Sequence, residues 1–157
     1  MEKLIQPARE AGRVDPRRLV LTGLFAALGC VATMVLQIPS PTGGYLNLGD
    51  TVVILGAWLL GPVYGAAAGG VGPAMADLLS GYAVYVPGTL VIKALMALTA
   101  ALGYRAAKKR GLLLWAVAAE ALMVLGYWLY DALLAALRAT PAGRAGRLEF
   151  EHVDAGL

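Results

Sequence analysis

The sequence predicts an all-α integral membrane protein, a bundle of about five transmembrane helices with its N-terminus in the cytoplasm. Three observations predict this fold. Hydrophobic residues make up 59% of the 157 residues and charged residues only 15%, whereas soluble domains are about half apolar and a quarter charged. The apolar residues gather into runs near the length of about 20 residues that crosses a bilayer. Lys and Arg cluster beside these runs, as they do at the cytoplasmic ends of membrane helices.

Five apolar runs follow one another along the chain, separated by turn-rich or basic segments. The second run is short, and the third is rich in Gly and Ala, which membrane helices use for close packing. The predicted spans cover residues 19–38, 46–60, 63–80, 87–104 and 112–137. We therefore expect three regions. These are a cytoplasmic N-terminal tail at 1–18, a single membrane domain at 19–137, and a polar, disordered C-terminal tail at 138–157.

Two basic flanks predict the orientation of the helices. The first flank holds Lys3, Arg9, Arg13, Arg17 and Arg18, and the second holds Arg105, Lys108, Lys109 and Arg110. Cytoplasmic flanks collect Lys and Arg, and the four spans between the two flanks bring both to the same side. The loops at 39–46 and 81–86 contain no Lys or Arg and are expected outside. This clustering beside apolar runs favours membrane orientation over nucleic-acid binding.

Several classes of chemistry are excluded by what the sequence lacks. Cys30 is the single cysteine, which excludes an internal disulfide and a cysteine-based metal site. The single histidine, His152, lies in the predicted tail, so no histidine is available in the membrane as a metal ligand or as an acid–base group. No Walker-type phosphate loop is present. We expect no bound metal, no cofactor and no catalytic residues.

Ionisable residues inside membrane spans are costly and mark functional sites by default. In the predicted orientation, four such residues lie toward the outer side of the membrane: Asp50, Asp77, Lys93 and Asp131. Tyr127 precedes Asp131 by one helical turn on the same face. The segment at 41–50 combines paired glycines with an aromatic residue, a pattern suited to closing over a ligand. The residues expected to bind substrate are Tyr45, Asn47, Asp50, Asp77, Lys93, Tyr127 and Asp131.

Structural alternatives stay open for several of these residues. Asn47 and Asp50 stand at a helix start, where they can act as caps. Asp77 and Lys93 can form an ion pair that holds the third span against the fourth. Trp128 and its neighbours suit an aromatic belt at the membrane surface as well as they suit a pocket.

A stripe of small residues runs along the first span: Gly23, Ala26, Ala27 and Cys30, at spacings of three and four residues. This is the pattern of close contacts between membrane helices. The stripe serves either packing within the fold or the docking of a partner.

A series of motifs runs in order through the spans. It begins with Gly-Tyr-Leu-Asn-Leu-Gly-Asp at 44–50 and Leu-Leu-Gly-Pro-Val-Tyr-Gly-Ala at 59–66. It continues with Gly-Gly-Val-Gly at 69–72, Ala-Asp-Leu at 76–78 and Pro-Gly-Thr at 87–89. In these motifs, and over about residues 18–137, the chain resembles the substrate-binding S components of energy-coupling factor (ECF) vitamin transporters. It is most similar to the branch for hydroxymethylpyrimidine, vitamin B6 and riboflavin.

The resemblance implies a membrane-embedded, vitamin-binding subunit of an ECF-type ABC transporter in a prokaryotic plasma membrane, with no enzymatic activity of its own. Such a subunit captures its vitamin from outside, then docks on a transmembrane coupling subunit driven by two ATPase subunits. The docking stripe of the family corresponds here to Gly23, Ala26, Ala27 and Cys30. Family members have six spans, so the last is expected to be missing here. The alternative is a small membrane scaffold or a membrane enzyme subunit that uses its buried carboxylates.

Overall fold

The computed structural model describes residues 15–35, 37–39, 45–106 and 111–139. Within these ranges the chain forms five helices and two short strands. In chain order they are α2 (Pro16–Val35), β1 (Gln37–Pro39), β2 (Tyr45–Asn47), α3 (Gly49–Leu60), α4 (Pro62–Leu79), α5 (Val86–Ala106) and α6 (Leu112–Ala139). The predicted all-α membrane fold is confirmed. Residues 1–14 and 140–157 of the two predicted tails lie outside the described residues.

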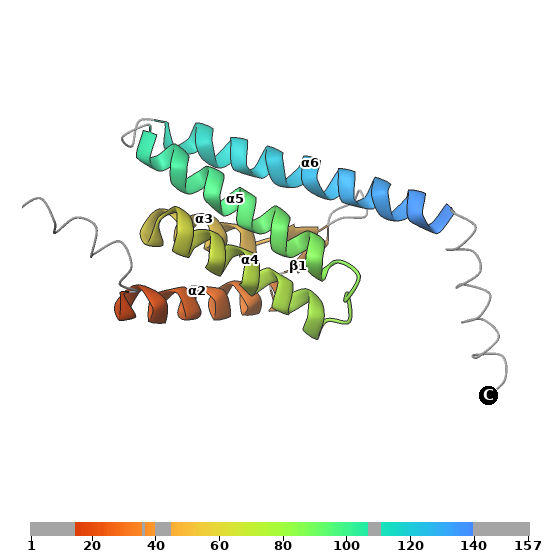
Figure 1. The fold of residues 1–157 in the computed structure, drawn as a ribbon, viewed down its shortest axis with the longest axis horizontal. Helices are drawn as coiled ribbons and strands as arrows, with labels where there is room; N and C mark the ends of the chain where they lie inside the picture. The colour runs from red at the N-terminus through yellow and green to blue at the C-terminus, as the bar shows by residue number, and fades with distance from the viewer. Residues whose placement is uncertain (1–14, 36, 40–44, 107–110, 140–157) are drawn as a thin grey trace, which may run out of the picture. The chain divides into compact units, whose positions relative to one another are not determined.

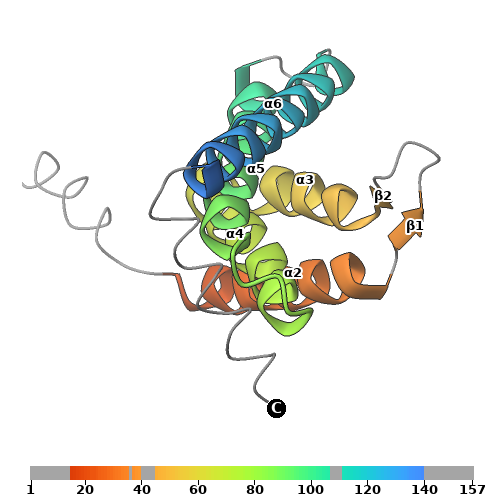
Figure 2. The same ribbon diagram turned by 90° about the vertical axis from the view of Figure 1, so that its right-hand side faces the viewer.

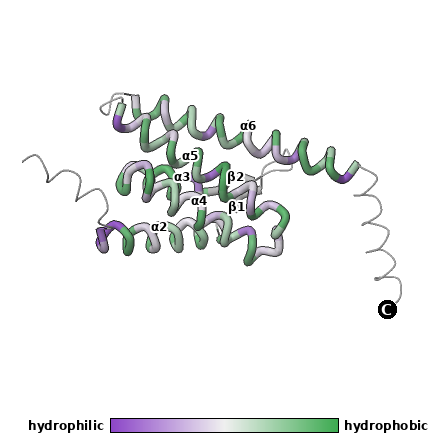
Figure 3. The backbone as a smooth tube through the Cα atoms, in the orientation of Figure 1, coloured by the Kyte–Doolittle hydropathy of each residue, from purple (hydrophilic) through white to green (hydrophobic). Residues whose placement is uncertain are grey.

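Among the described residues, three helices are long and apolar enough to cross a membrane, namely α2, α5 and α6, and α3 is a shorter apolar helix. The 12 residues of α3 rise about 18 Å, less than the roughly 30 Å of the hydrocarbon core. One face of α2 exposes Val20, Leu24, Val31 and Val35, a surface suited to lipid rather than to water. Figure 3 shows apolar residues distributed along every helix.

The first span ends earlier than the sequence predicts. Helix α2 ends at Val35, and Gln37–Pro39 forms β1 instead of the last helical turn. Proline disfavours a helical conformation in the residue before it, so Pro39 stops the helix from continuing. Strand β1 pairs antiparallel with β2, with Gln37 opposite Asn47 and Pro39 opposite Tyr45. The strand pair thus lies between α2 and α3 in the chain.

The chain divides into two compact units, residues 1–123 and 124–157, and α6 contributes to both. In the first unit α4 is the central helix, because it packs against α2, α3 and α5. Figures 1 and 2 show α4 between α2 and α5, with α3 alongside. The helices α2 to α5 run alternately from left to right and from right to left in Figure 1.

This alternation gives the first unit two distinct ends. The strand end holds β1 and β2, the ends of α2 and α4, and the starts of α3 and α5 (Figure 1). The arginine end holds the starts of α2 and α4 and the ends of α3 and α5, with Arg18 and Arg105.

Glycines let α4 approach its neighbours closely. A Cβ atom at Gly65 would lie 2.6 Å from the Cα of Ala57 in α3, and one at Gly72 would lie 2.5 Å from the backbone oxygen of Ala26 in α2. No larger side chain fits at either position without moving a backbone. The glycine-rich composition of the third predicted span is therefore a requirement of packing within the bundle.

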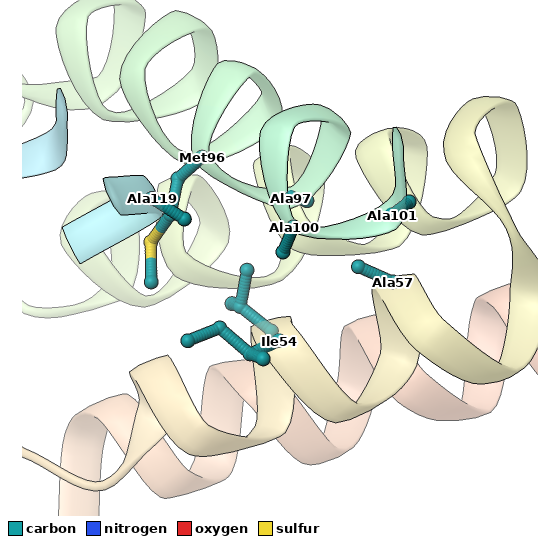
Figure 4. Packing of buried hydrophobic residues seen from close by; sticks show 8 residues of the cluster. Ile54, Ala57, Met96, Ala97, Ala100, Ala101 and Ala119 are labelled. Atoms are coloured by element: carbon teal, nitrogen blue, oxygen red, sulfur yellow. The ribbon is translucent and has the colours of Figure 1, made fainter. Parts of the chain in front are cut away.

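The buried core joins α3, α5 and the first half of α6. Its residues are mostly small, and Figure 4 shows Ile54 and Ala57 of α3 facing the alanines of α5, with Met96 as the largest side chain. Ala119 of α6 completes the cluster. Small side chains bring these helices close together, so any long polar side chain between them must find a partner nearby.

Candidate functional site

Three helices direct polar side chains toward one place near the strand end. Asp50 stands in the first turn of α3 and Asp77 near the end of α4. Thr89 and Lys93 lie one turn apart in the first half of α5 and therefore share a face. The antiparallel course of these helices places the start of α3, the end of α4 and the start of α5 at the same level (Figure 1). We call these four residues, together with Glu120 of α6, the polar cluster: Asp50, Asp77, Thr89, Lys93 and Glu120.

The Lys93 ammonium forms a salt bridge with the Asp50 carboxylate. Lys93 is only 4% exposed, and its Nζ also contacts the Sδ of Met123 in α6. A buried ammonium is costly unless a carboxylate compensates it, and the cost rises inside a bilayer. Asp50 therefore holds the charge of Lys93 within the apolar bundle and fixes the start of α3 against α5.

Asp77 accepts a hydrogen bond from the Thr89 hydroxyl, with an Oγ1–Oδ2 distance of 2.5 Å. Thr89 is buried, and Asp77 is half-buried and close enough to Lys93 to interact with it electrostatically. The sequence left open an ion pair between Asp77 and Lys93. The structure shows two other contacts: Lys93 pairs with Asp50, and Asp77 accepts a hydrogen bond from Thr89. Both contacts join neighbouring helices.

Glu120 adds a third carboxylate to the polar cluster. It is half-buried in the part of α6 that belongs to the first unit, and it interacts electrostatically with both Asp50 and Lys93. Three carboxylates thus lie within electrostatic range of one ammonium group, and one of them, that of Asp50, contacts it. The cluster is rich in hydrogen-bond acceptors, since ionised carboxylates accept and do not donate.

Two members of the polar cluster were not among the residues expected to bind substrate. Glu120 lies in the same predicted span as Asp131 and on the same helical face. This shared face is the feature of the sequence that could have identified it. Thr89 carried no signal of its own in the sequence, because a threonine inside a membrane helix commonly bonds to its own backbone. Its role depends on the position of Asp77 in a different helix.

The start of α3 shows that Asp50 does not act as its N-cap. The N-cap position is Leu48, which offers no side-chain hydrogen bond, and Asp50 is turned toward Lys93 instead. Tyr45 and Asn47 stand at the two ends of β2, just before this helix. Their part in substrate binding stays a prediction.

Tyr127 and Asp131 belong to the second unit. They stand one turn apart on α6, with Tyr127 half-buried and Asp131 exposed. Their place in a substrate site stays a prediction, as does the choice between pocket and membrane belt for the aromatic residues beside them.

The stripe of small residues on α2 divides between two environments. The backbone of Ala26 faces Gly72 of α4, within the bundle. A Cβ atom at Gly23 would meet nothing within 4 Å, and Ala27 is exposed. Cys30 is half-buried. The open part of the stripe is thus Gly23 and Ala27, which are one turn apart.

Comparison with known proteins identifies a family that matches this sequence. The family model described as "ECF-type riboflavin transporter, S component" matches residues 13–145, a range that includes every described residue. A protein of Pyrococcus woesei, described as "Uncharacterized protein in gap 3'region", is 42% identical over 99 residues. The alignment covers 62% of this chain and 66% of that relative, slightly less than two thirds of its length. No solved structure matches the chain.

Proposed function

The chain belongs to the family of S components of ECF-type riboflavin transporters, and from this premise we propose that it captures a vitamin or vitamin precursor from outside the cell for ATP-driven uptake. The family is one of substrate-binding transporter components rather than enzymes. The observation that carries the proposal is the polar cluster. A buried lysine, three carboxylates and a threonine converge between apolar helices, where unused ionisable groups are too costly to keep.

The chemistry of the polar cluster suits a neutral ligand with several O–H or N–H donors. Lys93 is engaged by Asp50, and the carboxylates of Asp77 and Glu120 leave acceptor lone pairs for a ligand. Excess negative charge repels anions in a low-dielectric site. Among the candidate vitamins this favours a hydroxyl-bearing flavin or a neutral pyrimidine or pyridine alcohol over a phosphorylated form.

The proposed orientation rests on the two basic flanks. Arg17 and Arg18 begin α2, and Arg105 lies in the last turn of α5, so the described residues of both flanks belong to the arginine end of the first unit. Cytoplasmic membrane surfaces attract such flanks. The strand end and the polar cluster then lie toward the outside, where an uptake protein meets its substrate.

The proposed partners are a transmembrane coupling subunit and two ATPase subunits. The open part of the α2 stripe, Gly23 and Ala27, supports this proposal because small exposed residues in a membrane helix permit close approach of another helix. No phosphate loop is present in this sequence, so the hydrolysis of ATP falls to partner subunits.

The experiment is a binding titration, in which calorimetry measures the binding of riboflavin, pyridoxine and hydroxymethylpyrimidine to the purified protein in detergent. One of these ligands is expected to bind, and its phosphorylated form is expected to bind at least about tenfold more weakly because of the carboxylates. The matched variants are Lys93→Met, which should abolish binding, and Thr99→Val, two turns along the same helix, which should preserve it. A folded protein that binds none of the three compounds would contradict the proposal and favour a membrane scaffold.

A further inference from the structure

A pocket lies at the arginine end of the first unit, away from the polar cluster. Its cavity volume is about 120 Å³, and it is lined by the last turn of α3, the end of α5 and the first turn of α2. Along α5, Lys93 and Arg105 are 12 residues apart, which corresponds to about 18 Å. The pocket is therefore separate from the proposed vitamin site.

Two guanidinium groups line this pocket, from Arg18 and Arg105. Arg18 has a carboxylate 3.7 Å away, that of Asp15, but both side chains are about half exposed, and such surface pairs are weak. No described carboxylate forms a salt bridge with Arg105. The pocket thus presents positive charge that the described part of the chain leaves largely uncompensated.

The backbone at Gly61 makes room for Arg105. Gly61 has a φ of 84°, a conformation that favours glycine. A Cβ atom at this position would lie 2.8 Å from Nη2 of Arg105. The turn between α3 and α4 is thus shaped so that the guanidinium group lies directly over it, at the wall of the pocket.

An aromatic pair forms another wall. The rings of Trp58 and Tyr104 stack with centroids 6.1 Å apart and an angle of 26° between their planes. The buried Nε1 of Trp58 has no hydrogen-bond partner among the described residues. Buried donors are normally satisfied, and the described residues supply no acceptor for this one.

The surroundings of the pocket are apolar. Leu59 lines it and is 66% exposed, and Leu19, next to Arg18, is 56% exposed. Trp and Tyr are typical of the level where the hydrocarbon core meets the headgroups. A ligand in this pocket therefore meets positive charge and N–H donors on one side and lipid-facing leucines on the other.

We propose that this pocket binds the phosphate group of an anionic phospholipid from the cytoplasmic leaflet. Guanidinium groups bind phosphate oxygens through paired, charge-assisted hydrogen bonds, and basic pockets between membrane helices on the cytoplasmic side bind anionic headgroups. The exposed leucines supply the contact for the acyl chains. The single negative charge of the bound phosphodiester partly compensates Arg18 and Arg105, and the lipid fixes the turn between α3 and α4. The inference requires only that the arginine end faces the cytoplasm, and it does not depend on which vitamin is bound.

The test uses the full chain in a mild detergent. Short-chain phosphatidylglycerol, short-chain phosphatidylcholine and inorganic phosphate are titrated separately, and bound lipid is counted by native mass spectrometry. One phosphatidylglycerol should be retained, with phosphatidylcholine and inorganic phosphate each binding at least about tenfold more weakly. Equal retention of phosphatidylcholine would overturn the proposal. Inorganic phosphate that binds as tightly and displaces the lipid would assign the pocket to a soluble anion instead.

Variants separate the pocket from the general basic surface. Arg105→Gln should weaken phosphatidylglycerol binding about tenfold or more, whereas Arg138→Gln, the same change in the last turn of α6, should leave it unchanged. Equal losses in the Arg105 and Arg138 variants would show non-specific attraction and contradict the inference. Vitamin binding should be unchanged in the Arg105 variant, which keeps this test independent of the proposed function.

Discussion

Lys93 of α5 forms its salt bridge with Asp50, which stands 43 residues earlier in the chain at the start of α3. The pair joins two helices that also meet through the buried alanines around Met96. It lies in the outer part of the bundle in the proposed orientation. The pair therefore stabilises the contact between α3 and α5, and under the proposed function substrate binding would depend on it as well.

Replacing Lys93 by Met should destabilise the protein by about 3–5 kcal/mol, because the Asp50 carboxylate would remain buried without its counterion. Thermal unfolding in detergent measures the change. The double variant Lys93→Met with Asp50→Asn should recover much of the lost stability, since neither charge then remains. Additive losses in the double variant would contradict a direct coupling of the two residues.

Replacing Thr89 by Val should cost about 1.5–3 kcal/mol, the range for a hydrogen bond to a charged group. The substitution keeps the size of the side chain but removes the donor to Asp77. Thr89→Ser keeps the hydroxyl and is the matched control, with a smaller expected loss. If the Val and Ser variants unfold at the same temperature, the hydrogen bond does not stabilise the α4–α5 contact.

Replacing Gly72 by Val should prevent the native packing of α2 on α4. A Cβ atom there would lie 2.5 Å from the backbone oxygen of Ala26, so the two helices must separate. The expected result is a loss of several kcal/mol, as for severe overpacking in a core, read from the yield of monodisperse protein and from thermal unfolding. Gly23→Ala is the control, because a Cβ atom there meets nothing within 4 Å, and it should change stability by less than about 1 kcal/mol.

Replacing Ala27 by Trp should prevent docking of the coupling subunit without affecting the isolated protein. Ala27 is exposed on α2, and a large ring there would hold a partner helix away. The measurement is co-purification with the coupling subunit and its ATPases, with vitamin binding of the isolated protein as the internal reference. Leu28→Trp is the matched control at the adjacent, also exposed position. Normal complex formation by the Ala27 variant would exclude this face as the docking surface.

Much of the fold follows from the sequence because membrane insertion depends on local composition. A run of apolar residues must form a helix in lipid, where every backbone polar group needs a partner within its own segment. The helices α4, α5 and α6 accordingly lie within a few residues of the predicted spans 63–80, 87–104 and 112–137. The basic flanks likewise predict orientation from position alone. The strand pair at 37–39 and 45–47 was missed, since three-residue strands leave too short a pattern to detect.

The polar cluster is only partly predictable in this way. Asp50, Asp77 and Lys93 stand out because each ionisable group in an apolar run is costly by itself. Which carboxylate pairs with Lys93 depends on how far α3, α4 and α5 are rotated and shifted against one another, and the nearest groups in space are remote in the chain. The tertiary structure therefore decided that Lys93 pairs with Asp50, that Thr89 donates to Asp77, and that Glu120 joins them.

The sequence alone thus determined the membrane environment, the approximate positions of the helices and the residues whose burial demands an explanation, because each depends on local hydropathy and charge. Only the tertiary structure decided the partners of those residues. It likewise decided which side of the α2 stripe faces Gly72 and which remains open, and it brought Arg18, Trp58 and Arg105 around one pocket. These relationships arise where close-packed helices cross, and side-chain contacts between helices are set by their mutual geometry.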